Sequence, residues 1–235
     1  MTETEFKNIK KIADLNTMAP GTSMCPGCGA IEGLKIIFNI LGENTIVVNA
    51  AGCMTLLVTY PFTPLGCSWL YTAMASAAAG GQGVRDALDI LTAKKKIPSS
   101  PAIRVVVLAG DGSAYGMGLS AASAAMDRGL DFYYICYDNE GYGNTGHQTS
   151  PATPPGVRTS TDGAGYGNPL GKKDLFAIWT AHRPAYAATL TAAEPIDLAR
   201  KVEKSIELKG PKMFLLLAPC PTNWRYDPAS TVDMA

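Results

Sequence analysis

The chain has 235 residues, with 20 basic and 20 acidic side chains and a formal net charge of zero. Without a basic stripe to neutralise phosphates, a nucleic-acid partner is excluded. No run reaches the roughly 18 apolar residues of a membrane helix, and residues 1–11 lack the apolar core of a signal peptide. We therefore expect a cytoplasmic protein without a membrane partner, built as one domain over residues 1–235.

The first half of the chain alternates predicted helices with a predicted strand. Residues 20–29 form a loop rich in Gly and Pro, and apolar residues at helical spacing then predict a helix over 30–41 that ends at Gly42. The run Thr45-Ile46-Val47-Val48 predicts a buried strand within 44–49. Residues 59–69 are predicted to be irregular, and residues 73–93, rich in Ala and Gly, to be helical.

The second half continues the alternation after a connector at 94–101. Its three lysines, Lys94-Lys95-Lys96, predict a solvated turn, on which an acidic ferredoxin could also dock. A long segment rich in Gly, Asn, Thr and Pro covers residues 138–172, and such a segment inside a domain is usually functional. The remaining predictions are strands at 103–109, 131–137, 185–189 and 213–218, and helices at 119–128, 175–181 and 195–208.

Strands that alternate with helices predict an α/β fold, with a mostly parallel sheet and helices on both faces. Ligands of such sheets bind outside the carboxyl ends of the strands. Four motifs of polar or small residues directly follow predicted strands: Gly52-Cys53, Gly110-Asp111-Gly112, Asp138-Asn139 and Cys220. We therefore expect the functional site at this edge of the sheet.

The first motif with a specific chemistry is Gly110-Asp111-Gly112, followed after 26 residues by Asn139. This spacing matches the thiamine-diphosphate signature, in which Mg²⁺ holds the diphosphate through oxygen ligands. Asp111, the Asn139 side chain and the Gly141 carbonyl are the candidate ligands. Gly110 and Gly112 would let the backbone approach the phosphates and donate amide hydrogen bonds to them.

Two other interpretations of this motif are weaker. A strand-ending Asp-Gly turn is common, but it does not account for Asn139 at this spacing. A dinucleotide site needs a third glycine in the pattern G-x-G-x-x-G, which is absent here. In that site Asp111 would also place a negative charge beside the pyrophosphate. The sequence therefore favours a diphosphate held through a metal ion.

Six cysteines form the second informative group. Cys25 and Cys28 form a C-x-x-C pair, whereas Cys53 and Cys220 each follow a predicted strand, so four thiols can converge at one sheet edge. They suit a [4Fe-4S] cluster, although a structural zinc ion remains an alternative. Cys136 is predicted to be a buried small hydrophobe, and Cys67 is a minor fifth candidate ligand.

The combined motifs resemble the β subunit of pyruvate:ferredoxin oxidoreductase and related 2-oxoacid:acceptor oxidoreductases. The segments that carry the resemblance span nearly the whole chain: Cys25-Pro-Gly-Cys-Gly-Ala30, Val48-Asn-Ala-Ala-Gly-Cys53, Gly110-Asp-Gly112, Tyr134-Ile-Cys-Tyr-Asp-Asn-Glu140, Asn144-Thr-Gly146 and Ala218-Pro-Cys-Pro-Thr-Asn-Trp224. Members of this family often continue beyond the segment that follows Cys220.

The resemblance implies a thiamine-diphosphate-binding fold and assigns roles to particular residues. It implies that Cys25, Cys28, Cys53 and Cys220 hold a [4Fe-4S] cluster, and that Asp111, Asn139 and the Gly141 carbonyl bind Mg²⁺. Asn144 and Thr145 would line the reacting end of the cofactor as catalytic residues. Gly29, Gly52 and Cys53 are expected beside it.

The family reaction is the oxidative decarboxylation of a 2-oxoacid to acyl-CoA and CO₂, with electrons passed to ferredoxin. Pyruvate is the favoured substrate, and oxalate, branched-chain and aromatic 2-oxoacids remain alternatives. The resemblance implies that an α subunit supplies the carboxylate that activates the cofactor. Neither Glu32 nor Glu140 of this chain is placed for that role. Further γ and ferredoxin-like δ subunits are also expected, so this chain alone should be inactive.

Two functions of other kinds stay open at this point. A non-oxidative thiamine-dependent decarboxylase or ligase would leave the four cysteines unexplained, and a zinc-stabilised interaction module would leave the Gly-Asp-Gly motif unexplained. His147, beside Gln148, could contact substrate, whereas His182 is predicted to cap a helix or lie on the surface. Arg158 and Arg225 could meet a carboxylate or phosphate of substrate or coenzyme A, although surface ion pairs are the simpler expectation.

Overall fold

The computed structural model describes residues 17–235 apart from 60, 62 and 163–164, so residues 1–11, which the sequence analysis discussed, lie outside the described residues. A six-stranded sheet forms the centre, with all paired strands parallel and the order β2-β1-β3-β4-β6-β5. Its strands are β1 (Thr45–Ala50), β2 (Ser68–Thr72), β3 (Arg104–Gly110), β4 (Tyr133–Asp138), β5 (Tyr186–Thr191) and β6 (Lys212–Leu217). The predicted parallel α/β sheet is confirmed.

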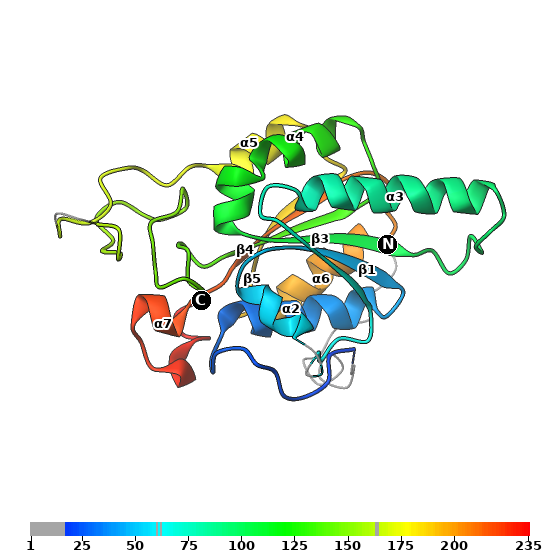
Figure 1. Cartoon of the computed structure of the whole chain (residues 1–235). Helices are drawn as coiled ribbons and strands as arrows, with labels where there is room; N and C mark the ends of the chain where they lie inside the picture. Colours follow the sequence, from blue (N-terminus) through cyan, green and yellow to red (C-terminus); the bar gives the residue numbers. More distant parts are fainter. Residues whose placement is uncertain (1–16, 60, 62, 163–164) are drawn as a thin grey trace.

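Helices cover both faces of this sheet, as the alternating pattern predicted (Figure 1). On one face lie α2 (Gly29–Leu41) and α6 (Pro195–Ser205), which contact each other. The opposite face carries α3 (Ala77–Ala93), α4 (Leu119–Asp127) and α5 (Leu175–Ala181), and the short α7 (Pro221–Trp224) follows β6. Among these described helices none is both long and apolar enough to cross a bilayer.

The central strands separate two hydrophobic cores. Val106 and Leu108 of β3 point into the core beneath α2 and α6, whereas Val105 and Val107 point into the core beneath α3 and α4. All four side chains are at most 1 % exposed, and burial of each contributes about 1.5–3 kcal/mol. A strand that is buried on both faces has a continuous run of apolar residues. For this reason the strand predicted at 103–109 agrees with β3.

The strand register aligns the functional edge. Asn49 is opposite Leu108, Gly110 is opposite Tyr137, and Asp138 is opposite Leu217. The residues that follow β1, β3, β4 and β6 therefore emerge side by side. The sheet thus brings four loops together that are far apart in the sequence.

The structure corrects the prediction at three places near this edge. Part of the segment 59–69, predicted to be irregular, belongs to β2, and α3 begins only at Ala77. The edge strand β2 is exposed: the exposed fractions of Leu70 and Tyr71 are 44 % and 51 %. A strand with so little burial does not need the alternation of apolar and polar residues by which strands are predicted from sequence. A π-helix at Gly112–Met117 was also missed, and such segments often occur at functional sites.

Candidate functional site

A cavity of about 260 Å³ lies at the carboxyl ends of β1, β3 and β4. Nine residues that the sequence assigned to cofactor, metal or catalysis line it: Gly52, Cys53, Gly110, Asp111, Gly112, Asn139, Gly141, Asn144 and Thr145. Of the predicted cofactor residues, Gly29 is the one that lies outside this wall. We call this space the diphosphate cavity.

The Asn139 side chain faces two oxygen atoms in this cavity. One terminal atom of its amide lies 2.8 Å from Asp111 Oδ1 and 2.7 Å from the Gly141 carbonyl oxygen. With nitrogen at this position the amide donates to both oxygens, whereas with oxygen there three acceptors face one another. A bound cation would satisfy all three oxygens in the second orientation, so these residues fit the oxygen ligands expected around Mg²⁺.

The backbone between these ligands adopts an unusual conformation. Glu140 has a φ of +62°, which few residues other than glycine adopt. Its amide donates to Asp138 Oδ1 at 3.1 Å, and its carbonyl accepts from Thr153 Oγ1 at 2.8 Å. These bonds hold the turn that presents the Asn139 side chain and the Gly141 carbonyl on the same side.

Asp111 is the most strongly perturbed carboxyl group at the site. It is 2 % exposed and accepts a hydrogen bond from the Ser150 hydroxyl. Burial, and next the charge of Asp138, raise the pKa of the Asp111 carboxyl to about 7. A carboxyl group in this environment gains most from a bound cation, because the cation offsets both the burial and the repulsion.

The raised pKa of Asp111 predicts a pH dependence of the cofactor-free chain. A carboxyl group whose folded-state pKa exceeds its ordinary value stabilises the fold while protonated, and this contribution is lost as the pH rises through about 7. The melting temperature of Asp111→Asn should therefore rise relative to that of the wild type between pH 5 and 8. Thermal unfolding at several pH values measures this difference, and parallel curves would contradict the prediction.

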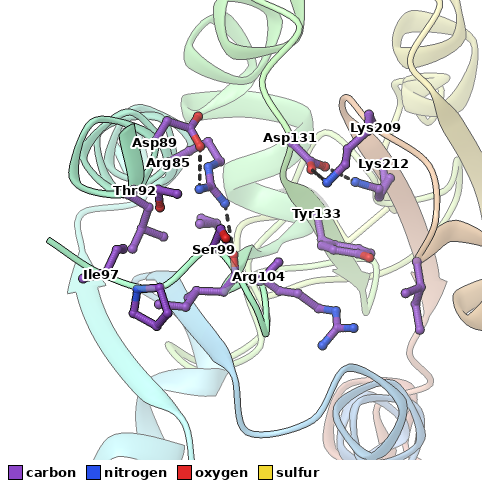
Figure 2. Close-up of a pocket in the computed structure, with 16 residues that line it drawn as sticks. Arg85, Asp89, Thr92, Ile97, Ser99, Arg104, Asp131, Tyr133, Lys209 and Lys212 are labelled. Carbon is purple, nitrogen blue, oxygen red and sulfur yellow. Dashed lines mark hydrogen bonds and ion pairs between the residues drawn. The ribbon is translucent and has the colours of Figure 1, made fainter. Parts of the chain in front are cut away.

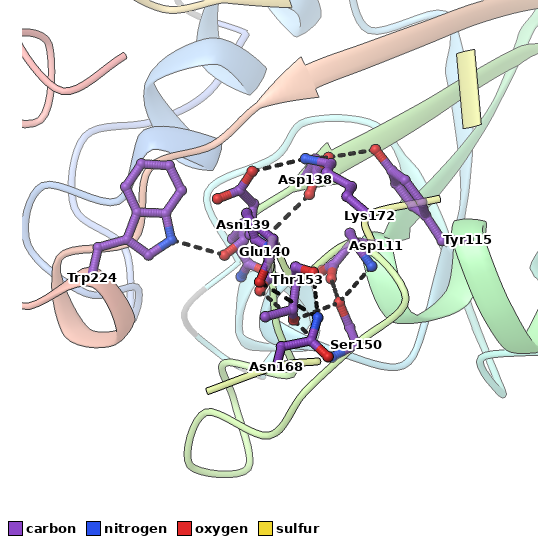
Figure 3. Close-up of polar contacts among 12 residues, drawn as sticks. Asp111, Tyr115, Asp138, Asn139, Glu140, Ser150, Thr153, Asn168, Lys172 and Trp224 are labelled. Carbon is purple, nitrogen blue, oxygen red and sulfur yellow. Dashed lines mark hydrogen bonds and ion pairs between the residues drawn. The ribbon is translucent and has the colours of Figure 1, made fainter. Parts of the chain in front are cut away.

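A second polar cluster supports the turn at residues 139–141 from behind (Figure 3). Lys172 Nζ lies 2.8 Å from Asp138 Oδ2 and 2.8 Å from Glu140 Oε1. The Tyr115 hydroxyl donates to Asp138 Oδ2 at 2.5 Å. Because the Asp138 side chain is only 3 % exposed, its charge depends on these partners. Through these ion pairs Lys172 connects the end of its long loop to the last residue of β4, Asp138.

Replacement of Lys172 by methionine should destabilise the protein by about 2 kcal/mol or more, because it leaves the buried Asp138 without its cationic partner. The matched control is Lys201→Met, which removes a lysine from the solvated pair with Asp197, 2.6 Å away. That variant should lose less than about 1 kcal/mol. Denaturant unfolding compares the two, and equal losses would show that the Lys172 cluster has no special role.

Two glycines of the Gly-Asp-Gly motif are required by neighbouring tyrosines. A Cβ atom on Gly112 would lie 2.1 Å from Cε1 of Tyr142, and one on Gly110 would lie 3.0 Å from Cε2 of Tyr137. The sequence assigned both glycines to the approach of phosphates. The structure adds a packing reason within the chain itself, and Tyr137 and Tyr142 also line the diphosphate cavity.

The four cysteines assigned to a cluster line a second cavity, of about 230 Å³. Cys25 and Cys28 come from the loop before α2, Cys53 follows β1, and Cys220 follows β6. We call this space the cysteine cavity. Neither of the two remaining cysteines lines it: Cys136 is fully buried in β4, as predicted, and Cys67 packs against the core near Trp69.

Gly29 explains how two of these cysteines come close. A Cβ atom on Gly29 would lie 2.7 Å from Cδ and 2.8 Å from the backbone nitrogen of Pro219. The Gly29 amide also donates to the Pro219 carbonyl at 3.1 Å. The start of α2 therefore touches the exit of β6, so that Cys28 and Cys220 face the same cavity. Gly29 was predicted to bind the cofactor, and the geometry gives it a packing role instead.

Burial and mutual repulsion make the four thiols poor acids in the absence of iron. Burial, together with the smaller effect of the neighbouring cysteines, raises the pKa of Cys28 to about 11 and that of Cys53 to about 12. Burial likewise raises the pKa of Cys220. Within the described part of the chain, no three His, Cys, Asp or Glu side chains are arranged to hold one metal ion. The thiols thus surround a volume and do not converge on a point.

The diphosphate cavity and the cysteine cavity adjoin each other. Both are lined by Cys53, Leu56, Asn139, Gly143 and Asn144. The residue that follows β1 and the turn that follows β4 therefore form a shared wall. A group bound in one cavity would lie within one layer of side chains of a group bound in the other.

A third cavity, of about 650 Å³, lies beside the long loop. Its wall includes the cations Arg158 and Arg225, together with His147 and Trp224. Burial, and next the charge of Arg225, lower the pKa of His147. The indole nitrogen of Trp224 donates to the Asn139 carbonyl at 3.2 Å, which connects this cavity to the turn at residues 139–141. His182, by contrast, lies at the end of α5 and contacts Ser123 and Asp127.

Sequence reasoning missed several residues of the site. Tyr71 and Met74 line the diphosphate cavity because β2 pairs with β1, and β2 was not predicted. Ser150 and Lys172 lie in the irregular segment, where no periodicity indicates a partner. The only indication for Lys172 in the sequence is its charge at the end of a loop rich in Gly and Pro, and this indication is weak.

Comparison with protein families places this site among thiamine enzymes. Residues 50–215 match the family described as thiamine pyrophosphate enzyme, C-terminal TPP binding domain. The matched region contains the diphosphate cavity and Cys53. It begins after the C-x-x-C pair and ends before Cys220.

Curated relatives match over nearly the whole chain. Pyruvate synthase subunit PorB of Methanothermobacter thermautotrophicus is 40 % identical over 95 % of this chain and 77 % of its own length. Pyruvate synthase subunit PorB of Thermotoga maritima is 37 % identical over 92 % of this chain and 68 % of its own. Ketoisovalerate oxidoreductase subunit VorB of Pyrococcus horikoshii is 39 % identical, with 92 % and 70 % covered.

A solved structure supports the fold. The chain resembles a 2-oxoglutarate:ferredoxin oxidoreductase from Magnetococcus marinus with a TM-score of 0.72 and 24 % identity, over 90 % of this chain and 68 % of the other. At this identity the likeness speaks for the fold alone. Together with the sequence relatives, it confirms the resemblance inferred from the motifs. The chain belongs to the family of thiamine-pyrophosphate-binding oxidoreductase subunits that includes pyruvate synthase subunit PorB and ketoisovalerate oxidoreductase subunit VorB.

Proposed function

We propose that this chain is the thiamine-diphosphate-binding subunit of a 2-oxoacid:ferredoxin oxidoreductase that converts a 2-oxoacid, with pyruvate favoured, to acyl-CoA and CO₂. The observation that carries the proposal is the shared wall between the diphosphate cavity and the cysteine cavity. Electrons released during oxidative decarboxylation need an acceptor nearby. A non-oxidative decarboxylase would have no use for four thiols at this position.

In the proposed site this chain's residues bind and orient the cofactor. Asp111, the Asn139 side-chain oxygen and the Gly141 carbonyl would hold Mg²⁺, and the backbone around Gly110 and Gly112 would face the diphosphate. Thiamine diphosphate, when bound, supplies the carbon chemistry of decarboxylation. The exposed Asn144 and Thr145 would face the substrate, with the Thr145 hydroxyl held by Gln148.

The cysteine cavity fits a [4Fe-4S] cluster better than a zinc ion. Tetrahedral zinc with bonds of 2.3 Å would need sulfur atoms about 3.8 Å apart. The thiols of Cys25, Cys28, Cys53 and Cys220 line one cavity of about 230 Å³, which offers a multi-iron cluster its four ligands around a shared volume.

Other subunits should complete the reaction. Glu32 is exposed on α2 and does not line the diphosphate cavity, and Glu140 pairs with Lys172. We therefore propose that an α subunit supplies the activating carboxylate, and that γ and ferredoxin-like δ subunits belong to the complex. Coenzyme A would approach through the third cavity, where Arg158 and Arg225 suit its phosphates.

Ferredoxin should accept electrons at the carboxyl edge of the sheet. Lys94-Lys95-Lys96 follow α3 and precede β3, at the amino edge. A ferredoxin docked there would be separated from the cysteine cavity by the length of the sheet. We therefore assign no electron-transfer role to this lysine turn.

Anaerobic purification of the intact complex tests the proposed function. The complex should contain iron, labile sulfide and thiamine diphosphate, and it should reduce ferredoxin with pyruvate and coenzyme A. A parallel survey with oxalate and with branched-chain and aromatic 2-oxoacids would identify the substrate. A colourless protein that binds thiamine diphosphate would support a non-oxidative enzyme instead, and zinc without thiamine would support an interaction module.

A further inference from the structure

A second enclosed site lies at the opposite, amino edge of the sheet (Figure 2). The cavity measures about 240 Å³ and is bounded by α3, by the starts of β3 and β4, and by the segment that precedes β6. We call it the amino-edge cavity. The reaction proposed for the carboxyl edge uses none of its residues.

The charges around the amino-edge cavity are unbalanced. Its wall includes four cationic side chains, Arg85, Arg104, Lys209 and Lys212, and two anionic ones, Asp89 and Asp131. The four positive charges minus the two negative charges leave a net charge of +2, whereas the whole chain has a formal net charge of zero. Cations concentrated around a concave site attract anions from solution.

The ion pairs at this site leave part of the positive charge uncompensated. Asp131 accepts from the buried Lys212 and lies 3.3 Å from Lys209 Nζ, so one carboxylate serves two lysines. The Arg104 guanidinium donates to the Leu41 carbonyl at 2.7 Å and has no ion pair among the described residues. Among these cations Lys212 and Arg85 are largely buried, and a further bound anion would offset the cost of burying them.

Arg85 points to the same conclusion. Its side chain is 12 % exposed and contacts Asp89 at 2.6 Å and the Ile103 carbonyl at 3.0 Å. Its Nε atom is buried and has no hydrogen-bond partner in the part of the chain that the structure describes. A guanidinium has five N–H donors, and these two contacts leave donors on its terminal nitrogens available for an oxyanion in the cavity.

The connector after α3 adds apolar walls and further cations. Ile97 and Pro98 line the amino-edge cavity together with the Tyr133 ring and the hydroxyl-bearing Ser99. They also line an adjoining cavity whose wall includes Lys95 and Lys96. The lysine turn, which the proposed reaction does not use, therefore stands at the entrance of the amino-edge cavity.

We propose that the amino-edge cavity is a binding site for a small organic anion, in which one oxyanion group, phosphate or carboxylate, meets Arg85 and Lys209. The apolar side chains around Tyr133 would contact the carbon body of this ligand. The volume of the cavity suits a compact metabolite rather than a dinucleotide. The proposal is independent of the function proposed for the carboxyl edge.

Calorimetric titration of the intact complex tests this site, with thiamine diphosphate, Mg²⁺ and coenzyme A saturating so that the diphosphate cavity and the third cavity are filled. The probes are inorganic phosphate and malonate, each compared with chloride at equal ionic strength. The wild type should show one saturable site. Arg85→Gln should weaken binding by tenfold or more, and Lys209→Gln, which changes an 83 % exposed side chain and spares the fold, by about threefold.

Lys35→Gln is the matched control, because it removes the same charge from an exposed position on α2. Its affinity should stay within twofold of the wild type. Binding of phosphate alone would identify the ligand as a phosphate ester, and binding of malonate alone would identify it as a carboxylate. The proposal is overturned if neither probe shows saturable binding, or if Lys35→Gln loses as much affinity as Arg85→Gln.

Discussion

The variant Asp111→Asn is expected to lose thiamine diphosphate binding, with its affinity in the presence of Mg²⁺ lowered by about 100-fold or more. The substitution keeps the size of the side chain but removes the negative charge that would hold the cation. The free chain should remain folded and be at least as stable as the wild type at pH 8. At that pH the wild type carries a buried carboxylate that Asp138 repels.

The matched control for this prediction is Asp138→Asn. Asp138 is also buried and acidic, but its carboxylate pairs with Lys172 and accepts from Tyr115. That variant should keep its cofactor affinity within about fivefold while losing stability, because it breaks the Lys172 cluster. Equilibrium binding of thiamine diphosphate, followed by tyrosine and tryptophan fluorescence, separates the two effects. Retained binding in Asp111→Asn would overturn the metal-site assignment.

The parts of the site that lie directly on strand ends could be predicted from the sequence. Apolar runs such as 105–109 locate buried strands, and in a parallel sheet the residues after each strand must share one edge. Asp111 and Asn139 were therefore expected together, and the structure places them around one cavity. The cysteines after β1 and β6 follow from the same rule.

Contacts made by irregular segments could not be predicted. Lys172 reaches Asp138 across 34 positions of the chain, through a loop with no periodicity to fix its path. Its position depends on specific bonds, such as the one from Asn168 Nδ2 to the Thr153 carbonyl at 2.7 Å. The amino-edge cavity was missed for a similar reason, since Arg85 and Lys209 come together only when α3 and the end of α6 are packed on the sheet. The formal net charge of the whole chain is zero, so the composition gave no sign of the excess positive charge around this cavity.

The variant Cys53→Ser should uncouple the two cavities. Serine is a poor iron ligand, so the cluster should be lost and pyruvate-dependent reduction of ferredoxin should fall by about 100-fold or more, equivalent to a barrier higher by at least 2.7 kcal/mol. Bound thiamine diphosphate should remain, because the proposed Mg²⁺ ligands are unchanged. Iron and sulfide analysis of the intact complex, together with the cofactor content, measures both parts of the prediction.

The same substitution at Cys67 provides the control. Cys67 is also partly buried, but it lies outside the cysteine cavity, so Cys67→Ser should keep its iron, its cofactor and its electron transfer. Loss of both iron and thiamine diphosphate in Cys53→Ser would mean that the shared wall had collapsed, and then the variant would not separate the two sites. Loss of iron with the cofactor retained would show that the thiols serve electron transfer, because the half of the site that binds substrate and cofactor would be intact. Unchanged iron content in Cys53→Ser would contradict the proposed ligand set, because that set includes Cys53. The test uses this cysteine because it lines both cavities.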